Sequence, residues 1–274
     1  MLRSLKDLER YKVSATDGPL GSVVNFLLDD EHWAIRYLVV DTGGFLGGRQ
    51  VLVTPISFRE IDWYRRRFHL ALTKDEVKNS PSIDTHKPVS RQHEAEYQDY
   101  YGYPYYWGYA GLWGAGTLPT AMASRSSPAD RPLSKAAPGT ASPSTDDSHL
   151  RSVNELRTYH IHGTDGSIGH VDDFIVDDVT WRLPYLVVDT SDWWLGQKVL
   201  VAPQWASRVS WVERNVYLDI SRHAIEESPR WDPETPINRM YEERLYDFYG
   251  RPVYWTSPAP QAPTRGKHGS PGHP

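Results

Sequence analysis

Cysteine is absent from the 274 residues, so neither a disulfide nor thiolate chemistry is available to this protein. No apolar run approaches the roughly 18 residues that a transmembrane helix needs, so we expect no membrane span. The first residues, 1–7, carry charge where a secretory signal peptide has an apolar core, so no such signal is predicted. These three absences predict a cytoplasmic protein.

A strong net charge is missing as well. The formal net charge is −5, and a slightly acidic chain is not typical of nucleic-acid binding, so we expect no nucleic-acid partner. The charge is unevenly placed, because residues 1–107 sum to about −1 and residues 150–255 to about −6. Partner classes other than nucleic acid stay open.

The chain repeats itself at an offset of 148 residues. Residues 3–107 align with residues 151–255 without a gap, and about 39 of the 105 positions are identical. The most similar segments are Tyr37–Thr42 and Tyr185–Thr190. A period this long indicates a duplicated domain, because solenoid repeats are 20–50 residues long. We predict one domain over residues 1–107 and a second over residues 150–255.

The segments outside the repeat have a different composition. Residues 108–149 are dominated by Ala, Gly, Ser, Pro and Thr, which predicts a flexible linker. Residues 256–274 are rich in proline and basic, which predicts a disordered tail.

Each repeat reads as a series of short strands. Runs of β-branched and aromatic residues alternate with turn formers such as Asp17-Gly18, and turns recur every 8–12 residues. This spacing predicts a mainly β fold with a small antiparallel β-barrel of about six strands in each repeat. In the first repeat the predicted strands cover residues 11–15, 20–29, 35–42, 50–54, 58–64 and 68–72.

Helical signals follow the strands. Thr73 and Glu76 fit a capping box at the start of a short helix. A second helix is predicted to begin at Pro88, with an apolar stripe that includes Tyr97, and to end at Gly102. Each predicted barrel is therefore followed by a short helix and a C-terminal amphipathic helix.

The residues at fixed positions in both repeats resemble the PRC-barrel family, named after the barrel in the H subunit of the photosynthetic reaction centre. In the first repeat they are Asp17-Gly18, Gly21 to Val24, Tyr37 to Asp41, Val51 to Pro55 and Thr73 to Pro81, with counterparts in the second. The resemblance covers roughly 80 residues of each copy. It implies a small barrel used for assembly, and no transmembrane helix of the H-subunit kind is present in the sequence.

No catalytic constellation stands out, so we predict a non-enzymatic scaffold that binds a protein partner and needs no cofactor. Asp41 and Asp189 follow apolar strands, and we interpret both as caps of the turn at the strand end. The pairs Asp29-Asp30 and Asp177-Asp178 are interpreted as turns too. Arg65-Arg66-Arg67 could touch phosphate, but a solvated hairpin turn is preferred because the second copy has Glu213-Arg214-Asn215 there.

A small-ligand or metal-binding protein that uses either a histidine cluster or the aromatic tails is the alternative function. His160 and His162 lie on one face of a predicted strand, and His170 lies on the next, which is a pattern open to Zn²⁺ or Ni²⁺. The first copy has Lys12, Ser14 and Ser22 at the matching positions. We therefore favour unliganded histidines and predict no metal site.

Large rings beside glycines and in the aromatic tail are the candidates for partner binding. An exposed apolar patch usually marks an interface. Tyr103 and Tyr105 are aromatic in the first repeat only, which suggests a surface position for both. The two barrels are predicted to pair within the chain about a pseudo-two-fold axis, as duplicated domains derived from a homodimer do. The two glycine-flanked loops and the apolar helix faces are the candidate patches for this pairing, and the alternative is that the loop rings fold over the open end of their own barrel. The predicted partner-binding residues are Phe45, Leu46, Tyr103, Tyr105, Trp193 and Trp194.

Overall fold

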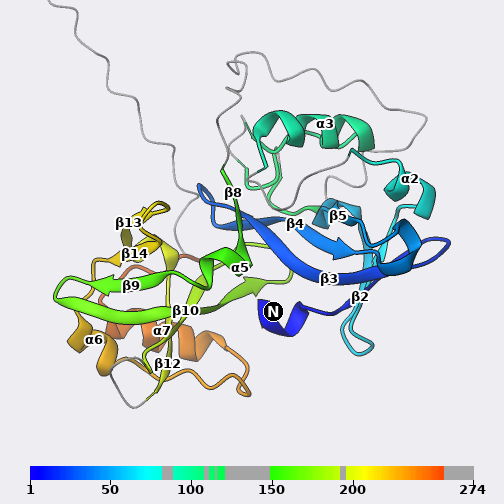
Figure 1. The fold of residues 1–274 in the computed structure, drawn as a ribbon. Coiled ribbons are helices and arrows are strands. Elements are labelled where there is room, and N and C mark those ends of the chain that lie inside the picture. Colours follow the sequence, from blue (N-terminus) through cyan, green and yellow to red (C-terminus); the bar gives the residue numbers. More distant parts are fainter. Residues whose placement is uncertain (82–88, 108–110, 115, 121–148, 192–195, 256–274) are drawn as a thin grey trace, which may run out of the picture.

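The computed structural model describes residues 1–81, 89–107, 111–114, 116–120, 149–191 and 196–255, with Leu46 described by its backbone alone. The described chain is mainly β, as predicted, and forms two seven-stranded sheets with helices packed against them (Figure 1). The predicted disordered tail lies outside the described residues, as does most of the predicted linker. Among the described residues, no helix is both long and apolar enough to cross a membrane.

Each sheet takes six strands from one repeat. The first sheet has the order β5-β4-β3-β2-β7-β6, and the second has the order β12-β11-β10-β9-β14-β13. The six strands of the first repeat agree with those that the sequence predicts. The bounds in the first sheet are β2 (Lys12–Ala15), β3 (Gly18–Asp29), β4 (Ala34–Asp41), β5 (Gln50–Val53), β6 (Phe58–Asp62) and β7 (Arg67–Leu70). Those in the second are β9 (His160–Gly163), β10 (Gly166–Asp177), β11 (Tyr185–Asp189), β12 (Lys198–Val201), β13 (Ala206–Ser210) and β14 (Asn215–Leu218).

Both sheets differ in one detail from the predicted antiparallel arrangement. The pair β2–β7 is parallel, and so is its counterpart β9–β14, whereas the other pairs are antiparallel. Hairpin signals in a sequence predict pairing between neighbouring strands only, and β2 and β7 are separated by four other strands. Each strand order is an open path in the described residues, so closure into a barrel stays a prediction.

A glycine allows the long strand β3 to cross close to the end of β4. A Cβ atom on Gly21 would lie 2.0 Å from the carbonyl oxygen of Asp41, and Gly169 has the same relation to Asp189. Both aspartates cap the following turn, because a carboxylate oxygen accepts a backbone N–H two residues on, at 2.8 Å in each repeat. The interpretation of these aspartates as turn caps is confirmed.

The helices begin where the capping residues place them. Thr73 and Glu76 form the predicted capping box. The C-terminal helix of the first repeat begins at Arg91 and not at Pro88, because the Ser90 hydroxyl accepts from the His93 N–H and acts as the N-cap. The helices are α1 (Leu5–Leu8), α2 (Lys74–Lys78) and α3 (Arg91–Tyr101), then α5 (Val153–Leu156), α6 (Arg222–Glu226) and α7 (Arg239–Phe248).

The C-terminal helices cover their sheets with aromatic side chains. The Tyr97 ring of α3 meets the Tyr37 ring of β4 edge-on at 5.1 Å, and its hydroxyl donates to the Leu52 carbonyl. In the second repeat, Tyr246 of α7 packs against Tyr185 and Trp205. Tyr97 of the predicted apolar stripe is therefore buried, whereas the buried ring in the second repeat is Tyr246, which corresponds to Gln98 and not to a residue of that stripe.

The first strand of each repeat lies in the sheet of the other repeat. Strand β1 (Leu2–Ser4) pairs with β10, and β8 (Leu150–Ser152) pairs with β3. Arg3 lies opposite Val176, and Arg151 lies opposite Leu28, so the two registers are equivalent under the 148-residue offset. In Figure 1, α1 and α5 accordingly lie in the middle of the molecule, between the two sheets.

Other contacts between the repeats obey the same symmetry. The Ile35 N–H donates to the Trp181 carbonyl at 2.8 Å, and the Leu183 N–H donates to the Trp33 carbonyl at 2.7 Å. Glu9 and Arg157 occupy matched positions and form an ion pair with each other. A contact between a residue and its own counterpart is typical of an isologous arrangement of two copies.

Two buried tryptophans pack at the boundary between the repeats. Trp181 of the second repeat is 2% exposed and packs on the rings of Phe58 and Phe68 of the first, at 5.3 and 6.1 Å. Trp113, inside the predicted linker, is 1% exposed, and its indole N–H donates to the Thr180 carbonyl. This short part of the predicted linker therefore packs on the fold.

Candidate functional site

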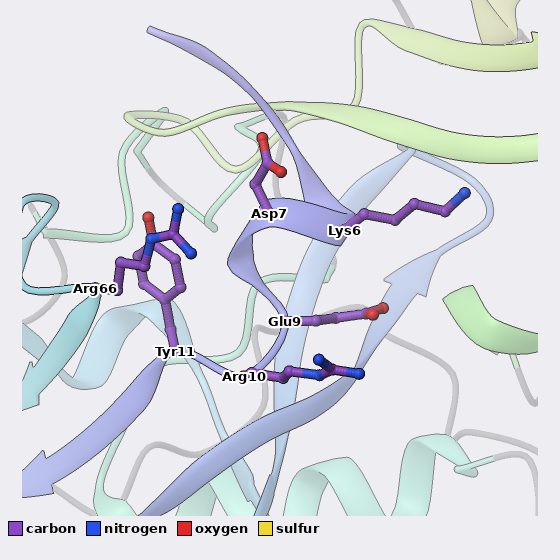
Figure 2. Close-up of a pocket in the computed structure, with 6 residues that line it drawn as sticks. All are labelled: Lys6, Asp7, Glu9, Arg10, Tyr11 and Arg66. Atoms are coloured by element: carbon purple, nitrogen blue, oxygen red, sulfur yellow. The ribbon is translucent and has the colours of Figure 1, made fainter. Parts of the chain in front are cut away.

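A cleft of about 400 Å³ opens beside α1, near the junction of the two repeats (Figure 2). Its lining is charged, apart from one tyrosine ring. Figure 2 shows Lys6, Glu9 and Arg10 extending side by side in one direction, while Arg66 and Tyr11 lie together on the other side. The residues that line this charged cleft are Lys6, Asp7, Glu9, Arg10, Tyr11 and Arg66.

Helix α1 and strand β2 fix one wall of the charged cleft. Ser4 caps the helix by accepting from the Asp7 N–H, and the buried Leu5 and Leu8 anchor the helix to the core. Consequently Lys6 and Asp7 face outward. Tyr11 leads into β2, and its ring packs on Phe68 at 5.5 Å, so its position is determined by the core.

Two arginines in the charged cleft have a left-handed backbone. Arg10 has φ +67° and Arg66 has φ +52°. Arg66 lies in the hairpin turn between β6 and β7, and its counterpart Arg214 has φ +54°, so that turn is a feature of both repeats. The counterpart of Arg10, Thr158, is not left-handed. Each such residue costs about 1 kcal/mol, and such strain is often found at functional sites.

The charges of the cleft are only partly paired. Lys6 forms an ion pair with Asp172 of the second repeat, and Glu9 pairs with Arg157. Among the described residues, Arg10, Arg66 and Asp7 have no ion-pair partner. The unpaired charges therefore comprise two guanidinium groups and one carboxylate.

Tyr11 contributes a neutral hydroxyl to the charged cleft. Burial raises the pKa of this phenol above its usual 10, although the guanidinium groups of Arg66 and Arg3 oppose that shift. The hydroxyl has no hydrogen-bond partner among the described residues. It is therefore protonated at neutral pH and available as a donor.

A second hollow, of about 310 Å³, extends the charged cleft towards the second repeat. It shares Asp7, Tyr11 and Arg66 with the cleft and reaches residues 231–237 of the second repeat. Trp231, Pro233, Pro236 and Ile237 add apolar surface there. The two hollows form one surface that crosses from one repeat to the other, and we call it the junction groove.

A separate cluster of titratable side chains is buried under α3. His149 is 5% exposed and Glu94 is 1% exposed, and His149 Nε2 lies 3.0 Å from Glu94 Oε2. Tyr106 donates its hydroxyl to Glu94 and also lies 3.0 Å from His149. Burial alone would lower the pKa of His149, but the hydrogen bond and charge of Glu94 outweigh it, and the pKa is raised. These groups bond to one another and to the core, so we assign them a structural role.

One group of potential metal ligands lies in the described part of the chain. Ligand atoms of Asp29, Glu31 and His32 lie within 4.8 Å of one another. The buried Asp29 is already held by the Arg36 guanidinium, at 2.7 and 3.1 Å, and a fixed cation at this carboxylate opposes a metal ion. The Arg36 charge and the His32 hydrogen bond overcome the effect of burial and hold the pKa of Asp29 below its usual range. We therefore assign no metal to this group.

The histidines of the alternative metal-binding function, His160, His162 and His170, do not form a compact set in the described chain. His160 lies opposite His170 in the β9–β10 ladder, whereas His162 lies opposite Ser167 and stacks on the Tyr217 ring. The pairing of β9 with β10 shifts register between Ser167 and Gly169, so His162 is not in regular register with the His160–His170 pair. In the described chain, these three imidazoles do not form a group whose ligand atoms all lie within 4.8 Å.

The prediction of a surface position for Tyr103 is wrong. Tyr103 is 5% exposed, its ring stacks on Tyr101 at 5.5 Å, and its hydroxyl bonds to Ser57. Gly102 ends α3 in the left-handed conformation, and the Tyr103 N–H then bonds to the Gln98 carbonyl. A residue placed in this way after a C-terminal glycine commonly folds back on its helix, so the signal was present in the sequence.

The other predicted contact residues have different outcomes. Tyr105 is partly exposed, stacks on Trp107 at 4.5 Å and donates to Asp99. Phe45 is 38% exposed, and the Lys74 ammonium lies 4.8 Å from its ring centre. Trp193, Trp194 and the Leu46 side chain lie outside the described residues. Partner binding by these residues stays a prediction.

The residues of the charged cleft are not predicted from the sequence pattern. Arg66 belongs to a segment that the pattern indicates to be a solvated turn, and no motif contains Lys6 or Arg10. The sequence holds one indirect clue to a role in the first repeat alone, because Lys6 and Arg10 are replaced by Asn154 and Thr158 in the second repeat.

No protein-family model and no curated protein matches this chain.

Proposed function

We propose that this chain is a non-enzymatic assembly module of the cytoplasm that binds a protein partner. The junction groove is the observation that carries the proposal. It offers charges of both signs, a free phenol and apolar side chains along a surface that crosses both repeats. Interfaces between proteins combine these elements, with polar groups around apolar and aromatic contacts.

The PRC-like barrel is part of the same proposal. Each repeat contributes six strands, the number predicted for one barrel, and the shared residues have fold-forming roles. Gly21 allows β3 to approach β4, Asp41 caps a turn and Thr73 caps a helix. These roles support a scaffold, because none of them depends on chemistry with a substrate.

We also propose that the two repeats act as one paired unit. The exchanged strands β1 and β8 support this, together with the ion pair between the matched residues Glu9 and Arg157. The predicted pairing used Phe45, Leu46, Trp193 and Trp194 together with the apolar helix faces, and the loop part stays a prediction because Trp193 and Trp194 lie outside the described residues. The contacts that support pairing come from the N-terminal strands and from Trp181. A paired unit holds the two sides of the junction groove in a fixed relation.

Site-specific photo-crosslinking tests the proposed function. Tyr64 lies 96% exposed in the hairpin turn that carries Arg66, and its counterpart Val212 is 97% exposed. We expect benzoylphenylalanine at position 64 to trap one discrete protein in the native cell, and the same probe at position 212 to trap much less of it. The absence of a discrete adduct at position 64, with the labelled protein folded and expressed, would contradict the proposal.

A further inference from the structure

We propose that the charged cleft binds an extended acidic segment of the partner protein, with carboxylates at Arg10 and Arg66. This inference rests on the proposed function and gives the partner its chemistry. Both arginines lack an ion-pair partner among the described residues, although the neighbouring Lys6 and Glu9 are paired. A guanidinium group binds a carboxylate through two parallel hydrogen bonds, so the two unpaired guanidinium groups can each bind one carboxylate.

The arrangement of the two arginines selects an extended ligand. Figure 2 shows Arg10 directed along Glu9 and Lys6, while Arg66 lies beside Tyr11 on the opposite side of the charged cleft. The two guanidinium groups therefore do not converge on one small anion. A chain with acidic side chains at two positions can reach both, and the free Tyr11 hydroxyl can donate to a carboxylate or carbonyl oxygen between them.

The carboxylates of the charged cleft distinguish a peptide, which has N–H donors along its backbone, from a phosphate polyanion, whose backbone has none. Asp7 has no ion-pair partner in the described chain, and Glu9 lies alongside Arg10 (Figure 2). A nucleic-acid backbone or an anionic membrane would bring phosphates against both carboxylates, and like charges at short range repel. A peptide offers backbone N–H groups or a basic side chain to Asp7. The charge pattern therefore favours a protein ligand.

The backbone of Arg10 supports a specific role for its side chain. In the first repeat, Glu9 is extended and Arg10 is left-handed, and the Arg10 N–H donates to the Val23 carbonyl at 2.9 Å. In the second repeat, Arg157 keeps a helical conformation and the Thr158 N–H donates to the Glu155 carbonyl. Only the first repeat has a left-handed residue, with its backbone strain, at this turn. The left-handed turn sets the direction of the chain at Arg10, which lines the charged cleft.

The second repeat supplies a matched control. Arg214 has the position and the backbone conformation of Arg66, but Thr158 and Asn154 replace Arg10 and Lys6 there. Changing Arg10 and Arg66 together removes both unpaired guanidinium groups, whereas changing Arg214 removes one charge from an equivalent turn. Glutamine preserves side-chain length at each position, and a thermal melt of each variant checks that the fold is retained.

The experiment measures binding of fluorescent hexaglutamate to the full chain by anisotropy at low ionic strength. We expect the Arg10→Gln/Arg66→Gln variant to bind about tenfold more weakly, since two partly exposed ion pairs are lost, and Arg214→Gln to change binding less than about twofold. Hexaserine of the same length should not bind. Equal binding by wild type and the double variant would overturn the inference.

Two further ligands test the kind of partner. Hexathymidylate and phosphatidylserine vesicles should bind more weakly than hexaglutamate, and tighter binding of either one that depends on Arg10 and Arg66 would overturn the assignment to a protein segment. The same variant separates this inference from the proposed function. If the double variant still crosslinks the cellular partner through position 64, the assembly function stands and the acidic-segment inference fails. If hexaglutamate binds as expected but no partner is trapped, the cleft chemistry stands and the assembly function fails.

Discussion

The two repeats bury the same glutamate in different surroundings. Glu94 of α3 and Glu242 of α7 occupy matched positions and are 1% and 3% exposed. Glu94 faces His149 at 3.0 Å. Glu242 accepts from the hydroxyls of Tyr185 and Tyr254, each at 2.9 Å, and pairs with Arg239 at 3.0 Å. Glu94 has the counterparts of the last two, Tyr106 and Arg91, so His149 is the partner that distinguishes the first copy.

The contrast extends to the neighbouring strand. Arg36 is 1% exposed and pairs with the buried Asp29, whereas the matched position in the second repeat is Pro184. The first repeat therefore adds a buried histidine and a buried Asp29–Arg36 ion pair to features that both repeats share. Removing one partner from a buried ion pair leaves a desolvated charge, so the first repeat should be the more sensitive of the two to substitution and to pH.

The largest expected effect follows from Arg36. We expect Arg36→Met to lower the free energy of unfolding by about 3–5 kcal/mol, because Asp29 loses its main cationic partner in a buried site. Urea unfolding measures the change. The double variant Asp29→Asn/Arg36→Met should recover a large part of the loss. A loss below about 1 kcal/mol for the single variant would show that the buried Asp29–Arg36 pair does not make the first repeat more sensitive to substitution.

The next effect concerns the tryptophans at the boundary between the repeats. Trp181 packs on Phe58 and Phe68, so Trp181→Ala should cost about 3–5 kcal/mol through the cavity that it leaves. Trp33, its counterpart, is partly exposed, and Trp33→Ala should cost less than half as much. Thermal unfolding of both variants makes the comparison, and equal losses would contradict the asymmetric packing.

A pH effect separates the repeats further. Since the pKa of His149 is raised in the folded protein, folding favours its protonated form. The stability that His149 contributes is therefore fully present below its unfolded pKa of about 6.5, and it is lost as the pH rises through the raised value. His149→Gln should flatten this part of the pH dependence of unfolding. A profile that keeps its shape in the variant would mean that Glu94 and His149 are not coupled in this way.

The smallest effect concerns the aromatic tail. Tyr103→Phe removes a buried hydrogen bond to Ser57 and should cost about 1 kcal/mol. Tyr105→Phe removes a bond from a partly exposed hydroxyl to Asp99 and should cost a few tenths of that amount. Chemical denaturation measures both. A larger loss for Tyr105→Phe than for Tyr103→Phe would contradict the burial of the Tyr103 hydroxyl.

Local features of the fold could be predicted because they have local causes. The strands follow from runs of β-branched residues, the α2 cap from Thr73 and Glu76, and the turn at the end of β4 from Asp41. The exchange of strands has no such signature. Leu2-Arg3-Ser4 and Leu150-Arg151-Ser152 are identical, so either segment fits either sheet, and only the surrounding structure decides the pairing.

The candidate site was harder to predict for a related reason. A charge in the sequence says nothing about whether a partner meets it in the fold. Lys6 and Arg10 look alike in the sequence, but Lys6 is paired with Asp172 from the other repeat, and Arg10 has no ion-pair partner in the described chain. The difference arises from the packing of the two repeats, to which repeat symmetry gives only an indirect clue.

Each repeat completes the sheet of the other. The chain has no cysteine, so a disulfide between two introduced cysteines reports this pairing without background. Leu2 and Asp177 lie opposite each other in the β1–β10 ladder. The neighbouring pair, Met1 and Asp178, is hydrogen-bonded, because the Asp178 N–H donates to the Met1 carbonyl. Leu2 and Asp177 are therefore a non-hydrogen-bonded pair, whose Cα atoms are close enough for a disulfide.

The measurement is oxidation of Leu2→Cys/Asp177→Cys in a chain with a protease site inserted in the segment 121–148, followed by cleavage and electrophoresis. We predict that the monomer forms the disulfide and that the two halves stay joined until reductant is added, while Leu2→Cys alone leaves the halves separate. Halves that separate without reductant, or a disulfide found only between molecules, would contradict the exchange of strands within the chain.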